Sequence, residues 1–550
     1  MSLHPQPIGP VPADTARVAR AAFPKGNVYV TIRDHIGVLF DDELFEPLFA
    51  PQGQPAEAPW RLALVCVLQF IEGLSDRQAA EAVRDRLAWK YLLGLELTDT
   101  GFHYSVLSAF RDRLIAGGLE LTLLDTMLAQ FKDRGWLKAR GQQRTDSTHV
   151  LAATRTLNRL ELVGETLRAA LNALAAAMPT WLRLHVQPDW FDRYSVRVEE
   201  ARLPKGLDAR TAYAATIGAD GMRILLAVYA ADAPPWLRDI PAVQILRQVW
   251  VQHYSVVDGQ VRLRAAVDLP PAGTRFDSPY DSDARYGNKR STTWTGYKVH
   301  LTETCAVGAV HLITHVETTQ AHIMDADLSV PIHDALERKD LLPHEHFIDS
   351  GYVDADLIVQ SKKAQGIEVV GPVRPNSSWQ ARSGTGYDAA AFIVDWDHQT
   401  VTCPQGRTNR SWTPHQDTWG NAVIAAKFSR TDCRLCNERA LCTRAATGPR
   451  LVLLRPQDDY HVLREMRRRQ ETAEWKGRYR RRAGIEGTLS QAIRAYERRQ
   501  TRYRGLAKTR LQHVLTALGL NLVRMAAWLS RPHHAMSRVS HFAALAPAAA

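Results

Sequence analysis

Residues 345–373 read EHFIDSGYVDADLIVQSKKAQGIEVVGPV, and this stretch decides the fold class. The apolar runs at 345–351 and 366–373 have the length and composition of buried strands, and the pattern of 352–365 predicts a helix between them. This strand-helix-strand order is typical of a mixed α/β sheet. Asp349 closes the first run, and open α/β sheets gather their ligands at the carboxyl ends of strands.

Three apolar runs upstream add further strands to this sheet, at 142–152, 294–306 and 308–319. The chain between the first and second of these runs is different in kind. It starts with an alanine- and leucine-rich helical pattern and continues as a segment rich in proline and tryptophan. We therefore expect a helical insertion at about 155–275, placed between two strands of the sheet.

The N-terminal part of the chain has helical periodicity. Apolar residues recur at three- and four-residue steps over 59–95 and 100–131, which predicts a compact helical bundle. Such spacing suits both a helix-turn-helix that contacts DNA and plain core packing, and both interpretations stay open. Alternating apolar runs within 386–456 predict a small β-rich insertion, and a helical pattern returns from about 458 to 529.

The formal charge of +11 is concentrated in one region of the chain. Residues 461–510 contain 16 lysines and arginines against 5 acidic residues, so their surplus equals that of the whole sequence. A concentrated positive field favours a polyanion, most often nucleic acid, held by phosphate contacts and counterion release. A basic helix that only faces solvent is the simpler alternative.

The sequence indicates neither a secretion signal nor a membrane span. Its first 20 residues lack the apolar segment of a signal peptide, and no run approaches the roughly 18 apolar residues of a membrane helix. We therefore expect a soluble, cytoplasmic protein. Six cysteines in 550 residues are too few for a disulfide scaffold.

Four of these cysteines cluster in a way that suits a metal ion. Cys403 opens CPQGR, and Cys433, Cys436 and Cys442 stand in CRLCNERALC. A C-x2-C pair with two further thiolates can hold Zn²⁺ tetrahedrally, although this spacing is looser than that of a standard zinc finger. We expect a structural Zn²⁺ that folds the β-rich insertion, with unliganded thiols as the alternative.

Three carboxylates stand out by their positions: Asp146 in the strand-like RTDSTHV, Asp349 at the end of HFID, and Glu486 among arginines in RYRRRAGIEG. Taken singly, Asp349 could be a helix N-cap, and Glu486 an exposed partner of Arg482. Taken together, two aspartates and a glutamate can hold two divalent ions about 3.5 to 4 Å apart, as phosphodiester displacement requires. Mg²⁺ or Mn²⁺ prefers such oxygen ligands.

These stretches together resemble a DDE transposase of a bacterial insertion sequence, with an RNase H-like catalytic core and a helical N-terminal domain. The motifs that carry the resemblance are TDSTHV at 145–150, SPYDSDARYGNKRSTTWTGYKVHLTET at 278–304, the strand-helix-strand segment at 347–373, YRRRAGIEGTLSQ at 479–491 and TRYRGLAKTRLQHVLTALGLNLVRM at 501–525. The resemblance implies that Asp146, Asp349 and Glu486 are the catalytic, Mg²⁺-binding triad.

Around the glutamate, relatives in this family often show Tyr-x2-Arg-x3-Glu-x6-Lys. Tyr479, Arg482 and Glu486 fit this pattern, but Ile493 takes the place of the lysine and the nearest base is Arg494. At about 100° per residue, Arg494 lies roughly 80° around the helix from Glu486. The predicted DNA-binding residues are Tyr479, Arg480, Arg481, Arg482, Arg494, Arg502, Arg504 and Lys508.

The resemblance also organises the chain into parts. We expect an N-terminal tail at 1–26, a helical domain for DNA binding or dimerisation at 27–140, the first part of an RNase H-like core at 141–385 with its helical insertion, the cysteine-containing β-rich insertion at 386–456, the basic C-terminal helices of the core at 457–530, and a flexible tail at 531–550.

The implied function is DNA transposition by a nucleoid-associated bacterial enzyme. It would bind double-stranded DNA at the terminal inverted repeats, hydrolyse the 3′-end phosphodiester with two divalent ions and transfer the 3′-OH to target DNA. Synapsis of two ends implies a homodimer. One alternative is a catalytically inactive or domesticated zinc-containing DNA-binding protein derived from a transposase. Another alternative is recombination through a covalent phosphotyrosine at Tyr503. A His-hydrophobic-His nickase is not indicated, because the HEH stretch at 344–346 has a charged residue at its centre.

Overall fold

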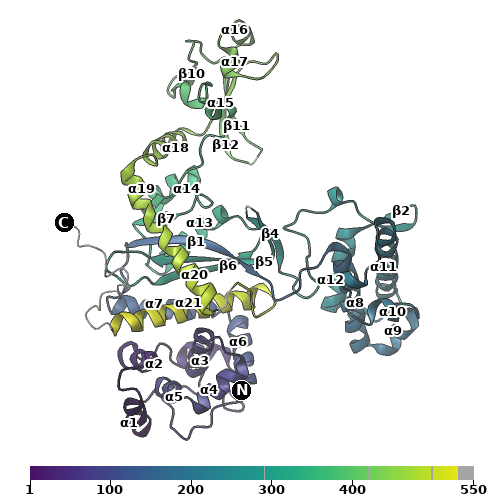
Figure 1. Ribbon diagram of the computed structural model, residues 1–550, viewed down its shortest axis with the longest axis vertical. Helices are drawn as coiled ribbons and strands as arrows, with labels where there is room; N and C mark the ends of the chain where they lie inside the picture. The colour runs from purple at the N-terminus through teal and green to yellow at the C-terminus, as the bar shows by residue number, and fades with distance from the viewer. Residues whose placement is uncertain (290, 419, 497–498, 531–550) are drawn as a thin grey trace, which may run out of the picture.

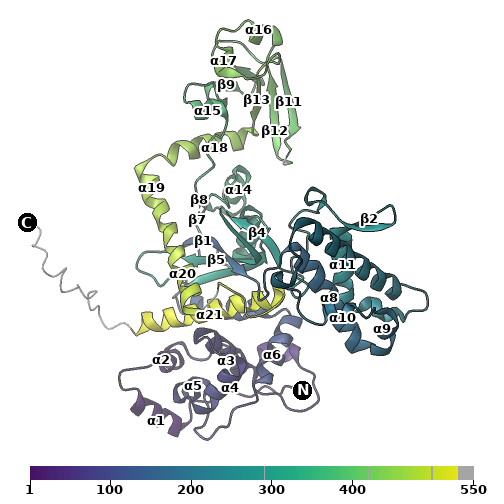
Figure 2. The same cartoon turned by 45° about the vertical axis from the view of Figure 1, so that its right-hand side comes forward.

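The computed structural model describes residues 1–289, 291–418, 420–496 and 499–530. A central sheet stands between three groups of elements (Figures 1 and 2). The N-terminal helices lie below it, a helical insertion lies beside it, and the cysteine-containing module lies above it at the end of a run of helices. The tail predicted at 531–550 lies outside the described residues.

The sheet is mixed, which confirms the α/β prediction. Its strand order is β4-β5-β1-β7-β8, and β6 also pairs with β5. β5 is antiparallel to β1, β4 and β6, whereas β7 is parallel to β1 and to β8. The strands are β1 (Gln142–Leu151), β4 (Arg285–Lys289), β5 (Thr292–Thr304), β6 (Ile313–Gln320), β7 (Glu345–Ile348) and β8 (Glu368–Val370).

Two long C-terminal helices cover the sheet. α20 (Gly484–Tyr496) packs on β1 and β5, and α21 (Leu506–Leu529) packs on β6. α21 is buried on almost every side because the N-terminal helices lie against its other face. A helix that is apolar nearly all round belongs in a core, and here the sheet, α21 and the N-terminal helices share one hydrophobic core.

The N-terminal helices form the predicted bundle. α3 is buried over nearly its whole length, and α4 starts with a capping box between Ser75 and Gln78. The exposed face of α4 carries both signs of charge, so DNA contact by these helices stays a prediction. The helices are α1 (Ala13–Ala22), α2 (Val28–Thr31), α3 (Pro59–Ile71), α4 (Asp76–Asp85), α5 (Leu87–Leu93), α6 (Ser105–Ala116) and α7 (Glu120–Asp133).

The insertion between β1 and β4 has a hydrophobic core of its own. It is mainly helical, as expected, but its proline- and tryptophan-rich end also forms a small β-hairpin. Its elements are α8 (Arg159–Ala177), α9 (Pro179–His185), α10 (Trp190–Tyr194), α11 (Leu207–Val228), α12 (Pro241–His253), β2 (Tyr254–Val257) and β3 (Gln260–Leu263).

The cysteine-containing module is built from short strands around a small apolar cluster. Its elements are α15 (Trp379–Ser383), β9 (Ile393–Asp395), β10 (Thr400–Thr402), β11 (Ser411–Gln416), β12 (Ala422–Lys427), α16 (Arg430–Arg434), α17 (Arg439–Cys442) and β13 (Leu451–Leu454).

The helical pattern predicted over 458–529 is divided into several helices. α18 (Gln457–Arg469) and α19 (Ala473–Tyr479) lead from the module back to the sheet, and the 3-10 turn η9 (Arg480–Ala483) joins α19 to α20. The side chain of Thr472 caps α19, and Gly505 precedes α21 with a positive φ of 91°. A capping residue or a glycine with positive φ ends or begins a helix without changing the apolar periodicity around it, so the periodicity alone did not show these breaks.

Among the described residues, no single helix is long and apolar enough to cross a membrane. α6 and α7 meet the length and composition criteria only as a pair, and the chain bends by 88° between them. Both helices contribute buried residues to the main hydrophobic core.

Candidate active site

The strand register brings Asp146 and Asp349 to adjacent positions. β1 and β7 run parallel with Thr145 opposite Ile348. Asp146 is the next residue on β1, and Asp349 is the first residue after the end of β7. The two carboxylates are held in the same way, since Oδ1 of each accepts a hydrogen bond from the following backbone N–H, Ser147 at 2.8 Å and Ser350 at 2.7 Å. Two residues 203 positions apart in the sequence therefore form one matched pair.

Asp349 is not the cap of the following helix. α14 (Ala355–Gln360) begins later than the sequence suggests, and its N-cap is Asp354, whose carboxylate accepts the N–H of Leu357 at 2.7 Å. The N-cap alternative for Asp349 is therefore wrong, because the helix already has a cap five residues downstream.

Arg482 links the third carboxylate to the sheet. Its Nη1 donates to Oδ2 of Asp146 at 2.7 Å, and its Nη2 donates to Oε1 of Glu486 at 2.9 Å. The Arg482 side chain is only 14% exposed, whereas that of Glu486 is 62% exposed. The pair between Arg482 and Glu486 is therefore more than a surface contact, since the same guanidinium also reaches a buried aspartate.

Asp349 acts on the same guanidinium. Burial lowers the pKa of Arg482, but the charge of Asp146, with a smaller contribution from Asp349, outweighs burial and raises it. Burial raises the pKa of Asp146, against the hydrogen bond from Ser147 and the charge of Arg482. Burial also raises the pKa of Tyr479 to about 12, and Asp349 and Asp146 add to this shift. Arg482 thus contacts two of the carboxylates, Asp146 and Glu486, and is also acted on by the charge of Asp349.

The donor set suits Mg²⁺ or Mn²⁺, because all three side chains offer carboxylate oxygens. Within the described parts of the chain, no three acidic, histidine or cysteine side chains lie together as a metal-binding group. Arg482 stands between Asp146 and Glu486, where its positive charge offsets their repulsion.

Two known families match parts of this chain. The family described as Transposase DDE domain matches residues 402–526, and the family described as Transposase domain (DUF772) matches residues 17–113. These two matches support a DDE transposase of an insertion-sequence type. No curated protein and no solved structure matches it. The DDE match contains Glu486, and the other match runs from within α1 to within α6 of the N-terminal helices.

The transposase has charged residues beside Asp146 that sequence reasoning missed. Asp325, at the start of the 3-10 turn η6 (Asp325–Leu328), accepts a hydrogen bond from Ser147 Oγ at 3.0 Å and one from Lys298 Nζ at 3.1 Å. Lys289 Nζ lies 3.4 Å from Ser147 Oγ. Lys298 lies within the motif at 278–304 that carries the family resemblance, but no local sequence pattern marks Asp325 as a candidate site residue.

The predicted DNA-binding residues fall into two groups. The first group lies on the helical segment around Glu486. Arg482 contacts Asp146 and Glu486, and Tyr479 stacks on Trp475 with ring centroids 4.9 Å apart. Arg480 and Arg494 are exposed, and Arg481 Nη1 donates to Gln142 Oε1 at 2.6 Å.

The second group has partners elsewhere. Arg502 donates to the Leu74 carbonyl at 2.6 Å, Arg504 lies over the Tyr280 ring and Lys508 pairs with Asp112 at 2.9 Å. Among the described residues, Arg482 is thus the one predicted DNA-binding residue with a contact to a triad carboxylate.

Tyr503 lies in a packed environment that does not favour a role as nucleophile. Its ring contacts Phe70 edge-on at 6.4 Å, and the guanidinium of Arg111 lies 5.5 Å from the ring centroid. Burial raises the pKa of Tyr503, which makes the phenolate less accessible.

The four clustered cysteines of the transposase line one cavity of about 40 Å³. All four are free thiols. Cys403 Sγ accepts the backbone N–H of Arg407 at 3.4 Å, and Cys433 Sγ accepts that of Arg450 at 3.5 Å. Burial raises the pKa of Cys442, and the other three thiols add to the shift while Arg450 opposes it. The donor set fits zinc, although the thiols do not already form a metal-binding group.

Proposed function

We propose that this transposase binds the ends of its insertion sequence, hydrolyses the 3′-end phosphodiester with two divalent ions and transfers the freed 3′-OH to target DNA. One observation carries the proposal: the β1–β7 register sets Asp146 beside Asp349, and Arg482 ties Glu486 to the same point. The mixed sheet, with β1 central and the parallel β7 and β8 beside it, supports an RNase H-like core.

Asp146, Asp349 and Glu486 would hold the Mg²⁺ or Mn²⁺ ions. When bound, such ions activate the attacking water and stabilise the charge on the scissile phosphate. The chain itself supplies the fixed geometry, because Ser147 and Ser350 orient the two aspartates through backbone N–H groups. Arg482 keeps the carboxylates together without DNA, and its guanidinium fork suits a DNA phosphate once the substrate arrives.

The exposed bases of η9 and α20 would hold the DNA backbone near the carboxylates. Arg480 and Arg494 are exposed, and the backbone phosphates supply the anions that such side chains bind. Recognition of two terminal repeats in one synaptic complex would require two copies of the chain, so we propose a homodimer on DNA.

The zinc site is proposed as a structural one. Backbone N–H groups already point at two of the four sulfurs, an arrangement that stabilises thiolates. Among the described residues of this module, the apolar cluster has six buried members, so a metal would contribute much of its stability.

The experiment is a nicking assay on DNA that carries the sequence immediately flanking the transposase gene. Wild-type protein with Mg²⁺ should nick at the element ends, and a gel shift should show binding to the same DNA. Binding without any Mg²⁺- or Mn²⁺-dependent nicking would contradict the proposal and favour a non-catalytic DNA-binding protein derived from a transposase.

A further inference from the structure

A buried carboxylate outside the triad, that of Glu303, joins the strand of Asp146 to the helix of Glu486. Glu303 on β5 is 0% exposed and lies directly opposite Arg144 on β1. Its Oε1 accepts hydrogen bonds from Arg144 Nε at 2.8 Å and from Arg144 Nη2 at 2.6 Å. This charge-assisted pair, in which two nitrogens of Arg144 meet one oxygen of Glu303, fixes β5 to the strand of Asp146.

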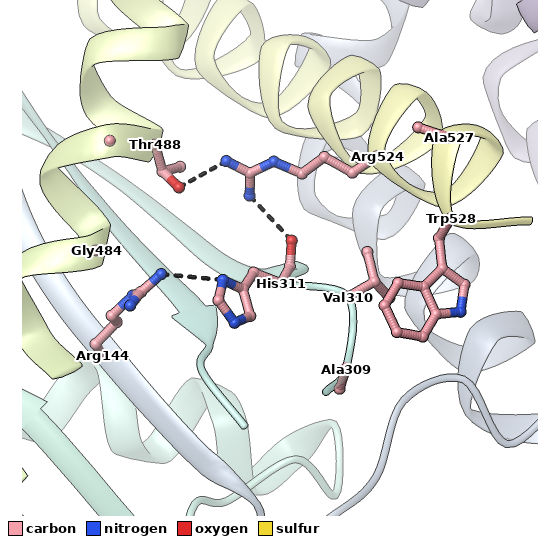
Figure 3. A pocket seen from close by; sticks show the side chains of 10 residues that line it. Arg144, Ala309, Val310, His311, Gly484, Thr488, Arg524, Ala527 and Trp528 are labelled. Atoms are coloured by element: carbon pink, nitrogen blue, oxygen red, sulfur yellow. Dashed lines mark hydrogen bonds between the residues drawn. The ribbon is translucent and has the colours of Figure 1, made fainter. Parts of the chain in front are cut away.

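The other oxygen of Glu303 reaches the helices. Oε2 accepts the hydroxyl of Thr488 on α20 at 2.6 Å and Nη1 of Arg524 on α21 at 2.9 Å. Arg524 also donates to Thr488 Oγ1 at 2.6 Å and to the His311 carbonyl at 3.0 Å, as Figure 3 shows. One carboxylate thus joins a strand and two helices.

Two of the residues that bind Glu303 lie two positions from a triad residue in the sequence. Arg144 precedes Asp146 by two residues, so both lie on the same face of β1, about 7 Å apart along the strand. Thr488 follows Glu486 by two residues on α20. Arg144 Nη1 also donates to the Arg481 carbonyl at 2.7 Å, next to Arg482.

A cavity borders the first turns of α20. This cavity of about 460 Å³, lined by Gly484, Thr488, Arg144, Arg524 and Trp528 among others, lies against the helix (Figure 3). A Cβ at Gly484 would stand 2.0 Å from Arg144 Nη1, so only glycine admits this guanidinium. The polar link therefore lines this cavity, next to the apolar contacts that Ile485 and Leu489 make with the main core.

We propose that Glu303 is a positioning residue that sets the distance between the strand of Asp146 and the helix of Glu486, and thereby the affinity of the triad for its metal ions. This inference rests on the proposed two-metal function. The carboxylate of Glu303 pairs with two guanidiniums, those of Arg144 and Arg524. Without its negative charge, these two cations would repel each other, and α20 could shift into the cavity.

The test compares Glu303→Gln and Thr488→Val with a matched control, Glu165→Gln. Glu165 is 2% exposed and binds Arg168 Nε at 2.8 Å, but it lies in the helical insertion. Glu303→Gln should raise the Mg²⁺ concentration for half-maximal nicking by about 10- to 100-fold and leave DNA binding unchanged. Thr488→Val should shift it in the same direction by less, and Glu165→Gln should leave it unchanged.

An unchanged Mg²⁺ requirement in both Glu303→Gln and Thr488→Val would overturn the inference. If Glu303→Gln does not fold, Thr488→Val decides alone, because it removes one neutral hydroxyl that donates to Glu303 and accepts from Arg524. If the wild type does not nick DNA, the proposed function fails separately, and hydrogen exchange of the α20 amides then tests the positioning role. Exchange should be faster in Glu303→Gln than in wild type and Glu165→Gln, and equal rates would refute the role.

Discussion

Glu486→Gln separates a metal ligand from a surface ion pair. The substitution keeps the size of the side chain, and the amide oxygen can still accept the hydrogen bond from Arg482. Glu486 is 62% exposed and lies four residues from its partner, a kind of pair worth about 0.3–0.5 kcal/mol. As a pure ion pair, its loss would change the folding equilibrium roughly twofold and leave nicking unaffected.

As a metal ligand, the same substitution removes one of three negative charges that hold the ions. We expect Mg²⁺-dependent nicking to fall by at least about 100-fold, which corresponds to about 2.7 kcal/mol of transition-state stabilisation. DNA binding should stay intact or strengthen slightly, because a negative charge near the phosphates has gone. The two interpretations therefore differ by far more than the error of a nicking assay.

The assay measures nicking of end-containing DNA by wild type, Glu486→Gln, Asp146→Asn and Asp349→Asn, with binding checked by gel shift. The matched control is Glu465→Gln on α18, which removes an exposed carboxylate paired with Arg468 and Arg469. Any pair of triad substitutions should be no worse than either alone, since one missing ligand already disables the unit. Nicking at the wild-type rate by Glu486→Gln would refute the assignment.

Three further predictions concern zinc, DNA and pH. Protein purified without chelators should contain about one Zn²⁺ per chain by metal analysis, and Cys436→Ser should lower this content and destabilise the module; zinc-free wild type would exclude the site. Replacing the exposed Arg480 and Arg494 with alanine should flatten the salt dependence of DNA binding by up to about two phosphate equivalents, whereas an unchanged slope would mean that these bases face only solvent. Burial raises the pKa of Asp146 and the charge of Arg482 opposes that shift, so Arg482→Gln should raise this pKa further. Mn²⁺ binding, followed by electron paramagnetic resonance, is lost as the pH falls through the pKa of Asp146 and should therefore be lost at a higher pH in the variant than in wild type. An unshifted pH profile would contradict this prediction.

Local patterns in the sequence were enough to predict the mixed sheet and to select Asp146, Asp349 and Glu486 as candidates. The alternation of buried strands and the helical periodicity between them depend on neighbouring residues only. The basic helix and the cysteine cluster are compositional signals of the same local kind. The roles of the triad and of the cysteines stay predictions.

The tertiary structure decided how these residues meet. The β1–β7 register aligns the two aspartates, and Arg482 spans 336 positions of sequence to reach Asp146. Asp354, not Asp349, caps α14, which depends on where the chain leaves the sheet. The link from Glu303 to Arg144 and Arg524 also had no local signal. Periodicity specifies which face of a strand or helix is buried, but which side chains meet across those faces is fixed only when the elements pack.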